Sequence, residues 1–314
     1  MTPTGPTTGP AVIPARVIAV VGPTAVGKTA ITHAVARAVG GQIIVADPFQ
    51  RYVGLEIAAD TPGARERSEV PHHMVRDLDL NATSTVADYA RRAHRIVDDL
   101  ATAGIPPVVS GGSGLYVRAA LTDMDFPPEP PADVRRDVER LVADDLPAAV
   151  AELRERSPET ASRIDATNPR RVVRALALAR IGREQPDSGA LWSGATRRPT
   201  TIVGLTRPRA VLHRRIERRV DREIADGLVE ELAAAASRTD LSRAAAQIIG
   251  MREVALHLAG DLSAEGLRER LIIRTRRLAR AQDTWIRKTP GIVTVDLGDD
   301  EPEDHVPAVL AHVT

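Results

Sequence analysis

The stretch that decides the fold is GPTAVGKT, which consists of Gly22, Pro23, Thr24, Ala25, Val26, Gly27, Lys28 and Thr29. It fits the pattern G-x-x-x-x-G-K-[ST], in which backbone N–H groups surround a phosphate and the lysine reaches the terminal phosphates. Residues 17–21 read VIAVV, which is typical of a buried parallel strand, and residues 29–39 have helical spacing before two glycines. This context favours a polyphosphate or pyrophosphate site over a chance glycine-rich turn, and the Thr29 hydroxyl is expected to help hold a metal ion.

The composition limits the classes of protein that remain. The 314 residues include 42 Lys+Arg, 42 Asp+Glu and no cysteine. This excludes disulfides and thiolate metal sites, and a neutral total argues against a globally basic nucleic-acid binder while leaving a local basic face open. No apolar run is long enough to cross a bilayer, so no membrane partner is expected. Residues 1–15 lack a signal peptide's apolar centre, and they predict a disordered tail on a cytoplasmic protein.

A second buried strand at residues 42–46 ends at Asp47. Ligands of open α/β sheets bind at the carboxyl ends of strands, so beside a phosphate loop Asp47 is interpreted as functional rather than only as the cap of a turn before Pro48. Residues 51–82 look irregular. His72 and His73 are adjacent and cannot face the same way on a regular element, so a metal pair is not expected and one structural or hydrogen-bonding histidine is.

An amphipathic helix is predicted at residues 83–102 and a strand at 105–110, followed by the glycine-rich loop GGSGLY at 111–116. Such a loop lets a substrate approach the backbone, although by itself it is also compatible with a tight connection. Nucleotide hydrolases of this loop class usually carry a second acid at the end of another strand. The 105–110 strand has none, which weakens the hydrolase interpretation and leaves a kinase open.

The second half of the chain is predicted to be mainly helical. A proline-rich joint leads into a charged helical insert at 126–184, and the core would comprise residues 16–125 and 185–298, with a strand at 200–205, helices at 208–236 and 264–288, a last strand at 292–296 and a loose tail at 299–314. The arginines of the two long helices concentrate the positive charge. The strand–helix alternation predicts an α/β fold, with a P-loop NTPase-like parallel sheet flanked by helices and a helical insert domain.

Taken together, the motifs resemble those of the bacterial tRNA dimethylallyltransferase (tRNA isopentenyltransferase) family over about residues 17–288. They are GPTAVGKT at 22–29, DPFQRY at 47–52, VPHH at 70–73, GGSGLY at 111–116, NPRRVVRAL at 168–176, LHRRIERR at 212–219 and TRRLARAQDTWIR at 275–287. Relatives that prenylate free adenine nucleotides share the first half of this set. The C-terminal motifs are more similar to those of the bacterial tRNA enzymes.

The resemblance implies transfer of a dimethylallyl group from dimethylallyl pyrophosphate to N6 of an adenosine next to the anticodon, with Mg²⁺ as the metal. The phosphate loop would then hold pyrophosphate as a leaving group, which accounts for the missing second acid. Asp47 matches the family's acid at the attacking amine, Thr24 and Ser113 match positions lining the reaction channel, and Arg219 would join Lys28 in stabilising the departing pyrophosphate.

The resemblance also implies a tRNA partner, bound through its anticodon stem-loop by a monomeric protein. Positions that match tRNA-contacting residues are Asp47, Pro48, Phe49, Gln50, Ser113, Arg135, Arg170, Arg171, Arg174 and Arg252. The sequence departs from the family pattern at residues 48, 58–62, 249–252 and 281–282, mainly on the side that the resemblance implies faces RNA. Prenyl transfer to a free adenine nucleotide is therefore kept as an alternative, with a phosphate-loop kinase behind it; intact Lys28, Thr29 and Asp47 argue against a non-catalytic RNA-binding relative.

Overall fold

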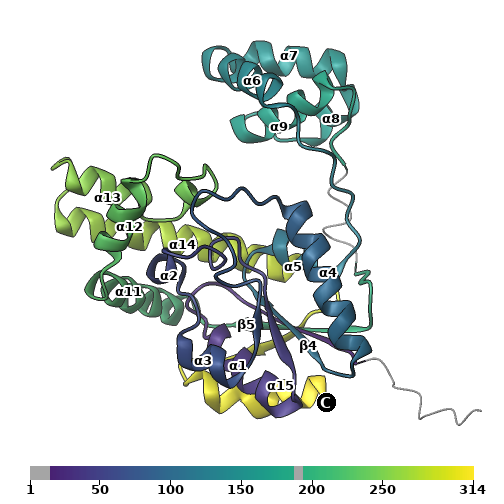
Figure 1. The fold of residues 1–314 in the computed structure, drawn as a ribbon, viewed down its shortest axis with the longest axis vertical. Helices are drawn as coiled ribbons and strands as arrows, with labels where there is room; N and C mark the ends of the chain where they lie inside the picture. Colours follow the sequence, from purple (N-terminus) through teal and green to yellow (C-terminus); the bar gives the residue numbers. More distant parts are fainter. Residues whose placement is uncertain (1–14, 187–193) are drawn as a thin grey trace, which may run out of the picture. The chain divides into compact units, whose positions relative to one another are not determined.

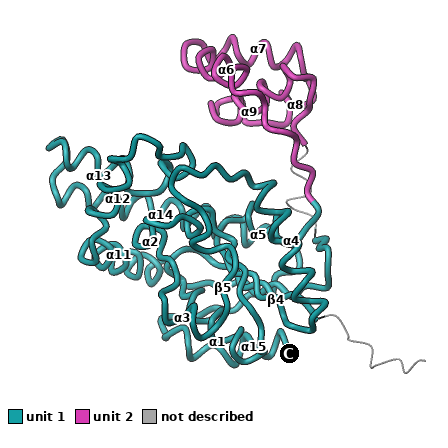
Figure 2. Tube along the Cα trace, viewed as in Figure 1, with its two compact units in different colours: residues 1–123, 191–314 teal, residues 124–190 magenta. Residues whose placement is uncertain are grey.

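The computed structural model describes residues 15–186 and 194–314 of the chain. The expected disordered tail lies outside the described residues, except for Ala15. The chain forms two compact units, one comprising Met1–Asp123 with Leu191–Thr314 and the other Met124–Ala190 (Figure 2). No helix in the described part of the chain is both long enough and apolar enough to span a bilayer.

A parallel six-stranded sheet forms the centre of the first unit, and it confirms the predicted α/β fold (Figure 1). The strand order is β3-β2-β4-β1-β5-β6. The strands are β1 (Val17–Val21), β2 (Gln42–Val45), β3 (His72–His73), β4 (Pro107–Gly111), β5 (Thr200–Thr206) and β6 (Val293–Asp296). All five residues of β1 are buried, as its apolar run predicts for a strand covered on both faces.

Helix α1 (Lys28–Val39) follows the phosphate loop as predicted. Gly27 before it and Gly40 after it both have positive φ angles, 111° and 63°, which a residue with a side chain rarely adopts. The Gly40 N–H binds carbonyls of the last helical turn and ends the helix. The glycines therefore set the direction in which α1 leaves the loop and returns to the sheet.

The segment after β2 is more regular than expected. The predicted irregular 51–82 region is interrupted by two short helices, α2 (Glu56–Ala59) and α3 (Ala64–Glu69), and by the two-residue strand β3. These helices span four and six residues, too few to show a helical period in the sequence. Both histidines of β3 are hydrogen-bonded to the protein, His72 Nδ1 to Val70 O at 2.8 Å and His73 Nε2 to Gln42 Oε1 at 2.8 Å.

Of the helices that follow, α4 (Val86–Thr102) and α14 (Ala264–Lys288) match the predicted helices at 83–102 and 264–288, whereas α5 (Gly114–Leu121) and α13 (Met251–Leu258) were not predicted. Helix α4 starts at a capping box in which the Thr85 hydroxyl accepts from Asp88 N, and α5 starts in the second glycine-rich loop. Between β5 and β6 lie α11 (Arg209–Ala225), α12 (Leu228–Ala236), α13 and α14. The predicted single helix at 208–236 was wrong, because Gly227, at φ 101°, separates α11 from α12.

The predicted loose tail after residue 298 was also wrong. The chain forms a 3₁₀ turn, η2 (Pro302–His305), and then α15 (Val306–Val313), which packs on α1 (Figure 1). Val309 is fully buried in the core of the first unit. Buried Arg207 donates to the carbonyls of Val26, Leu297, Gly298 and Asp300. The acidic side chains thus belong to the outer face of a segment whose inner face is apolar.

The second unit has helices and no strand among its described residues. It contains α6 (Ala132–Asp144), α7 (Leu146–Arg156), α8 (Pro158–Arg163) and α9 (Pro169–Arg180). Val138, Leu153 and Leu176 are fully buried in a core that this unit makes from its own helices. Asn168 caps α9 by accepting hydrogen bonds from the Arg170 and Arg171 amides, and Pro169 occupies the first helical position.

Candidate active site

A cavity of about 620 Å³ opens in the first unit where the phosphate loop and the turn after β2 meet. Helices α11 and α14 and the C-terminal segment complete its wall. The sequence-predicted residues that line it are Thr24, Ala25, Gly27, Lys28, Thr29, Asp47, Phe49, Gln50 and Arg219. Residues as far apart in the sequence as Thr24 and Arg219 therefore line the same cavity. It lies at the carboxyl ends of the strands, where open α/β folds bind ligands.

The phosphate loop is held by contacts from distant parts of the chain. Thr24 N donates to Gln282 Oε1 of α14 at 2.7 Å. A Cβ atom on Gly112 would lie 2.5 Å from Gln282 Nε2, so the glycine lets this amide reach the loop. A Cβ on Gly27 would lie 2.6 Å from Pro302 Cγ. The loop is thus shaped by α14 and by the C-terminal segment as well as by its own glycines.

Lys28 is half-buried beside the loop, and its Nζ donates to Pro23 O at 2.8 Å. Burial, and the positive charge of Arg219, lower the pKa of Lys28 to about 8, although Asp47 and Asp60 act in the opposite direction. An anionic ligand in the cavity would stabilise the charged form of Lys28 and so offset part of the effect of burial and of Arg219. Lys28 is therefore poised to gain from binding a phosphate.

Asp47 both caps a turn and lines the cavity. Its Oδ1 accepts from Phe49 N at 2.8 Å and from Gln50 N at 3.3 Å, so the turn that the sequence offered as the alternative role is present. Burial raises the pKa of Asp47, while these two amides, Lys28 and Arg219 limit the rise. A carboxylate in such surroundings is a stronger base than one in water.

Arg219 links α11 to the loop. Its Nη1 donates to Thr24 Oγ1 at 2.7 Å and to Asp60 Oδ2 at 2.9 Å, and its Nε donates to Glu223 Oε1 at 2.6 Å. One helical turn earlier, Arg215 Nε donates to Ala25 O at 3.0 Å. Two arginines of the positively charged helix α11 thus bind the phosphate loop directly.

Some predicted residues lie elsewhere. The following are not among the residues that line the cavity: Gly22, Pro23, Val26, Pro48, Ser113 and Arg252. Ser113 precedes α5, and its neighbour Gly112 lines the cavity instead. Pro48 and Phe49 line a separate cavity of about 210 Å³, and Arg252 is exposed on α13. The three remaining loop residues are buried and do not line the cavity: Gly22, Pro23 and Val26.

The remaining predicted arginines belong to the second unit. Arg170 and Arg171 are exposed at the start of α9. Arg135 is paired with Glu129 at 3.0 Å and Glu139 at 3.1 Å. Arg174 donates to Pro127 O at 3.4 Å, and burial lowers its pKa. Of the four predicted arginines in this unit, Arg170 and Arg171 are thus exposed, whereas Arg135 and Arg174 are engaged by protein groups.

Several polar residues that line the cavity were not predicted as site residues, among them Asp60, Glu223 and Gln282, which hydrogen-bond to Arg219 or to Thr24. Glu223 could have been found, because it lies four residues after Arg219 on a predicted helix and pairs with it. Asp60 and Gln282 reach the site only through the tertiary fold. No local pattern marks them.

A parallel sheet whose phosphate loop shares a cavity with an acid and an arginine defines a phosphate-loop α/β enzyme. The family model described as "IPP transferase" matches residues 50–289, and the chain belongs to this family of prenyltransferases. The resemblance seen in the motifs is confirmed.

Individual relatives agree with this assignment. The chain is 41% identical over 285 residues to the tRNA dimethylallyltransferase of Thermobifida fusca (strain YX), covering 88% of each chain. It is 39% identical to the one of Salinispora arenicola (strain CNS-205), covering 89% of this chain and 82% of that one. The full-length tRNA isopentenylpyrophosphate transferase of Bacillus halodurans superposes with a TM-score of 0.70 at 29% identity, covering 94% of each. A eukaryotic dimethylallyltransferase acting on tRNA, at 21% identity and a TM-score of 0.76 over 95% of this chain and 77% of that one, shares the fold.

Proposed function

We propose that this prenyltransferase moves a dimethylallyl group from dimethylallyl pyrophosphate to N6 of the adenosine next to the anticodon of tRNA. The observation that carries the proposal is the shared cavity, into which both the phosphate loop and the Asp47 carboxyl group open. A leaving pyrophosphate and an attacking amine would meet there without any nucleotide being hydrolysed.

In this reaction the donor's pyrophosphate lies on the amides of the phosphate loop, with Lys28 and Arg219 beside it. The N6 amine attacks the carbon that carries the pyrophosphate oxygen, a carbon–nitrogen bond forms, and the carbon–oxygen bond breaks. Negative charge develops on the departing pyrophosphate, where positively charged groups that are already oriented stabilise the transition state most. The donor and the cations thus need no rearrangement at the moment of transfer.

Asp47 accepts the proton that the amine must lose. Its fixed turn keeps the carboxyl group facing the cavity, and its raised pKa makes it a better proton acceptor. The acceptor adenine has to leave its stack to reach this depth, as in other enzymes that modify a base. Arg170 and Arg171 would then bind RNA phosphates from the second unit.

The residues present suit Mg²⁺. The described residues contain no group of three or more His, Cys, Asp or Glu side chains that could hold a metal, and Mg²⁺ typically takes few protein ligands together with substrate phosphates. Thr29 lines the cavity next to Lys28 and would hold the ion through its hydroxyl. Bound there, the ion would neutralise charge on the pyrophosphate.

The test is mass spectrometry of reactions that contain dimethylallyl pyrophosphate and Mg²⁺. One tube receives an adenosine-rich anticodon stem-loop, and another receives AMP, ADP and ATP. We expect a prenyl mass gain on the RNA and a much slower gain in a matched Asp47→Asn reaction. A gain on the nucleotides alone would replace the tRNA acceptor with a free nucleotide. No gain on either acceptor by the folded protein would reject both.

A further inference from the structure

The protein holds Arg219 through only some of its hydrogen-bond donors. A guanidinium group carries five N–H donors, one on Nε and two on each Nη. Glu223 takes the Nε donor, while Thr24 and Asp60 accept from Nη1. Among the described residues no hydrogen bond from Nη2 is found. The two donors of one nitrogen therefore remain for a ligand in the cavity that Arg219 lines.

We propose that Asp60 and Glu223 are positioning residues that orient Arg219 so that its Nη2 donors face the pyrophosphate of the donor substrate. The proposal rests on the proposed function in one respect only, because it requires a pyrophosphate ligand in this cavity. Glu223 binds only Nε and Asp60 binds only Nη1, so neither carboxylate uses Nη2. Both carboxylates can therefore stay in place when a phosphate binds Nη2.

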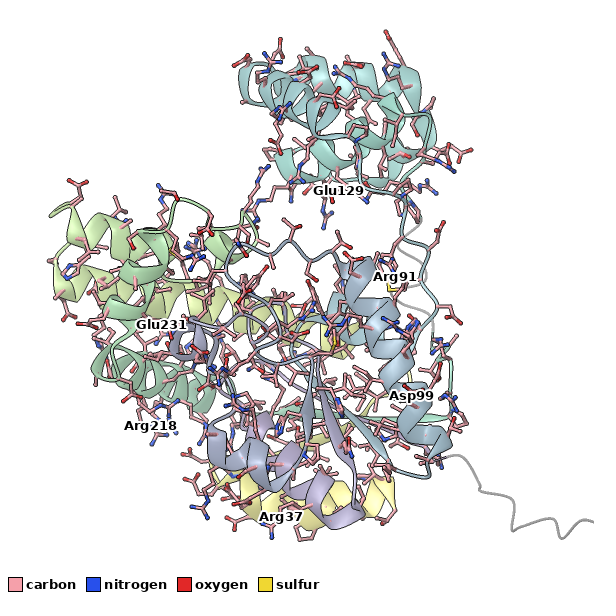
Figure 3. All side chains as sticks on the ribbon, viewed as in Figure 1. Arg37, Arg91, Asp99, Glu129, Arg218 and Glu231 are labelled. Carbon is pink, nitrogen blue, oxygen red and sulfur yellow. The ribbon has the colours of Figure 1, made fainter. Side chains whose placement is uncertain are left out.

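Asp60 is fixed independently of Arg219. Its backbone has φ 51°, a conformation that Asp tolerates better than most residues, and its carbonyl accepts from Gln50 Nε2 at 3.0 Å. The preceding helix α2 is anchored by Glu231 of α12, whose carboxylate accepts from Ile57 N and Ala58 N at 2.9 Å each (Figure 3). Asp60 therefore presents its carboxylate from a rigid support, as a positioning residue must.

Asp60 also connects the two halves of the site. The Asp60 carbonyl accepts from the side-chain amide of Gln50, and the backbone N–H of Gln50 donates to Asp47 Oδ1. The Asp60 carboxylate accepts from Arg219. A chain of hydrogen bonds thus runs from the acid that would accept the proton to the arginine that would meet the pyrophosphate. Displacing one end would shift the other, and displacements of about 1 Å at such groups cost up to about 100-fold in rate.

Glu223 provides the second support. It lies one turn along α11 from Arg219, and its side chain is only 12% exposed. Burial raises the pKa of Glu223, whereas the charge of Arg219 opposes that rise. The competing interpretation is that the two acids only neutralise Arg219 and repel pyrophosphate. The two interpretations predict opposite changes in pyrophosphate binding when an acid is removed.

The experiment uses four variants of the full chain. Glu223→Gln and Asp60→Asn keep an acceptor oxygen, whereas Glu223→Ala and Asp60→Gly remove it, and glycine also tolerates the positive φ. Asp221→Ala is the control, because Asp221 lies on the same helix but pairs with Arg268 and does not line the cavity. The readouts are the ¹⁵N NMR signal of the Arg219 Nε–H, the calorimetric Kd for inorganic pyrophosphate with Mg²⁺, and kcat and KM for prenyl transfer.

We expect Glu223→Ala and Asp60→Gly to broaden the Arg219 signal, to weaken pyrophosphate binding, and to lower kcat by roughly 10-fold to 100-fold with a smaller change in KM. The Gln and Asn variants should recover most of this loss. Tighter pyrophosphate binding, or an unchanged signal with an unchanged Kd, would overturn the proposal. If the wild type prenylates no acceptor, the proposed function fails, yet the signal and the Kd still decide whether the two acids position Arg219.

Discussion

At the residue scale, Asp47 uses one carboxylate oxygen for its own turn, since Oδ1 accepts from Phe49 N and Gln50 N. Asparagine can keep this acceptor but cannot take a proton. We therefore predict that Asp47→Asn lowers kcat by roughly 10²-fold to 10⁴-fold, the usual contribution of a general base, while the melting temperature stays close to that of the wild type. Single-turnover prenyl transfer and calorimetry measure the two quantities. Wild-type turnover in the variant would remove Asp47 from the chemistry.

Lys28 makes the affinity for pyrophosphate depend on pH. In the free protein its pKa is about 8, and pairing with an anion raises that pKa. Well below pH 8 the residue is charged in both states and adds no pH dependence. Above about pH 8 the free protein must take up a proton to bind, so affinity falls by up to about tenfold per pH unit.

Titration calorimetry with inorganic pyrophosphate between pH 7 and 9.5 checks this prediction. Lys28→Arg is the matched control, because a guanidinium stays charged throughout this range and the ligand's own titration is the same in both proteins. Equal slopes for the two proteins would mean that Lys28 is already fully charged before the ligand arrives.

Local sequence signals were sufficient to predict that the loop and Asp47 share one site, because each directly follows an apolar strand. They could not reveal the contact between Thr24 and Gln282, which lie 258 residues apart. Nor could they show that Asp60 meets Arg219, since an Asp in an irregular stretch looks like a turn residue. Ser113 shows that a resemblance can also be off by one position. It implied that Ser113 lines the reaction channel, whereas the neighbouring Gly112 lines the cavity.

At the scale of elements, the C-terminal helix α15 supports α1 through Val309, which is fully buried. We predict that Val309→Ala lowers the free energy of unfolding by about 2 kcal/mol, from the lost methyl groups and the cavity left behind. Val313, which is only partly buried on the same helix, is the control, and Val313→Ala should cost clearly less. Urea unfolding of both variants measures the difference; equal midpoints with wild type would restore the idea of a loose tail.

The type of an element was predictable where its apolar residues were continuous or helically spaced, or where a glycine marked its end, as in β1, α1, α4 and α14. The break at Gly227 was missed because one glycine in an Ala-, Arg- and Glu-rich stretch is compatible with a continuing helix. Helix α15 was missed because it spans only eight residues and follows an acidic segment. Its stability comes from packing on α1 rather than from its own sequence.

At the scale of the whole molecule, the exposed arginines of the second unit predict salt-dependent RNA binding. The double variant Arg170→Ala, Arg171→Ala should bind an anticodon stem-loop more weakly. It should also reduce the slope of log K against log salt by about 1 to 2, as expected for two lost phosphate contacts. The charge-matched control is Arg140→Ala with Arg154→Ala, on α6 and α7. Equal slopes for both double variants would assign the effect to net charge alone.

The contact of Pro302 with Gly27 also has a consequence for biosynthesis. About 275 residues separate the two positions, and translation at 5–20 residues per second takes roughly 15 to 55 s to cover that distance. Throughout that interval the nascent phosphate loop lacks its contact with Pro302. The core of the second unit, by contrast, is built from residues close in sequence and is complete once that unit has been translated. The ribosome thus finishes the helices of the second unit well before Pro302 can complete the wall of the cavity.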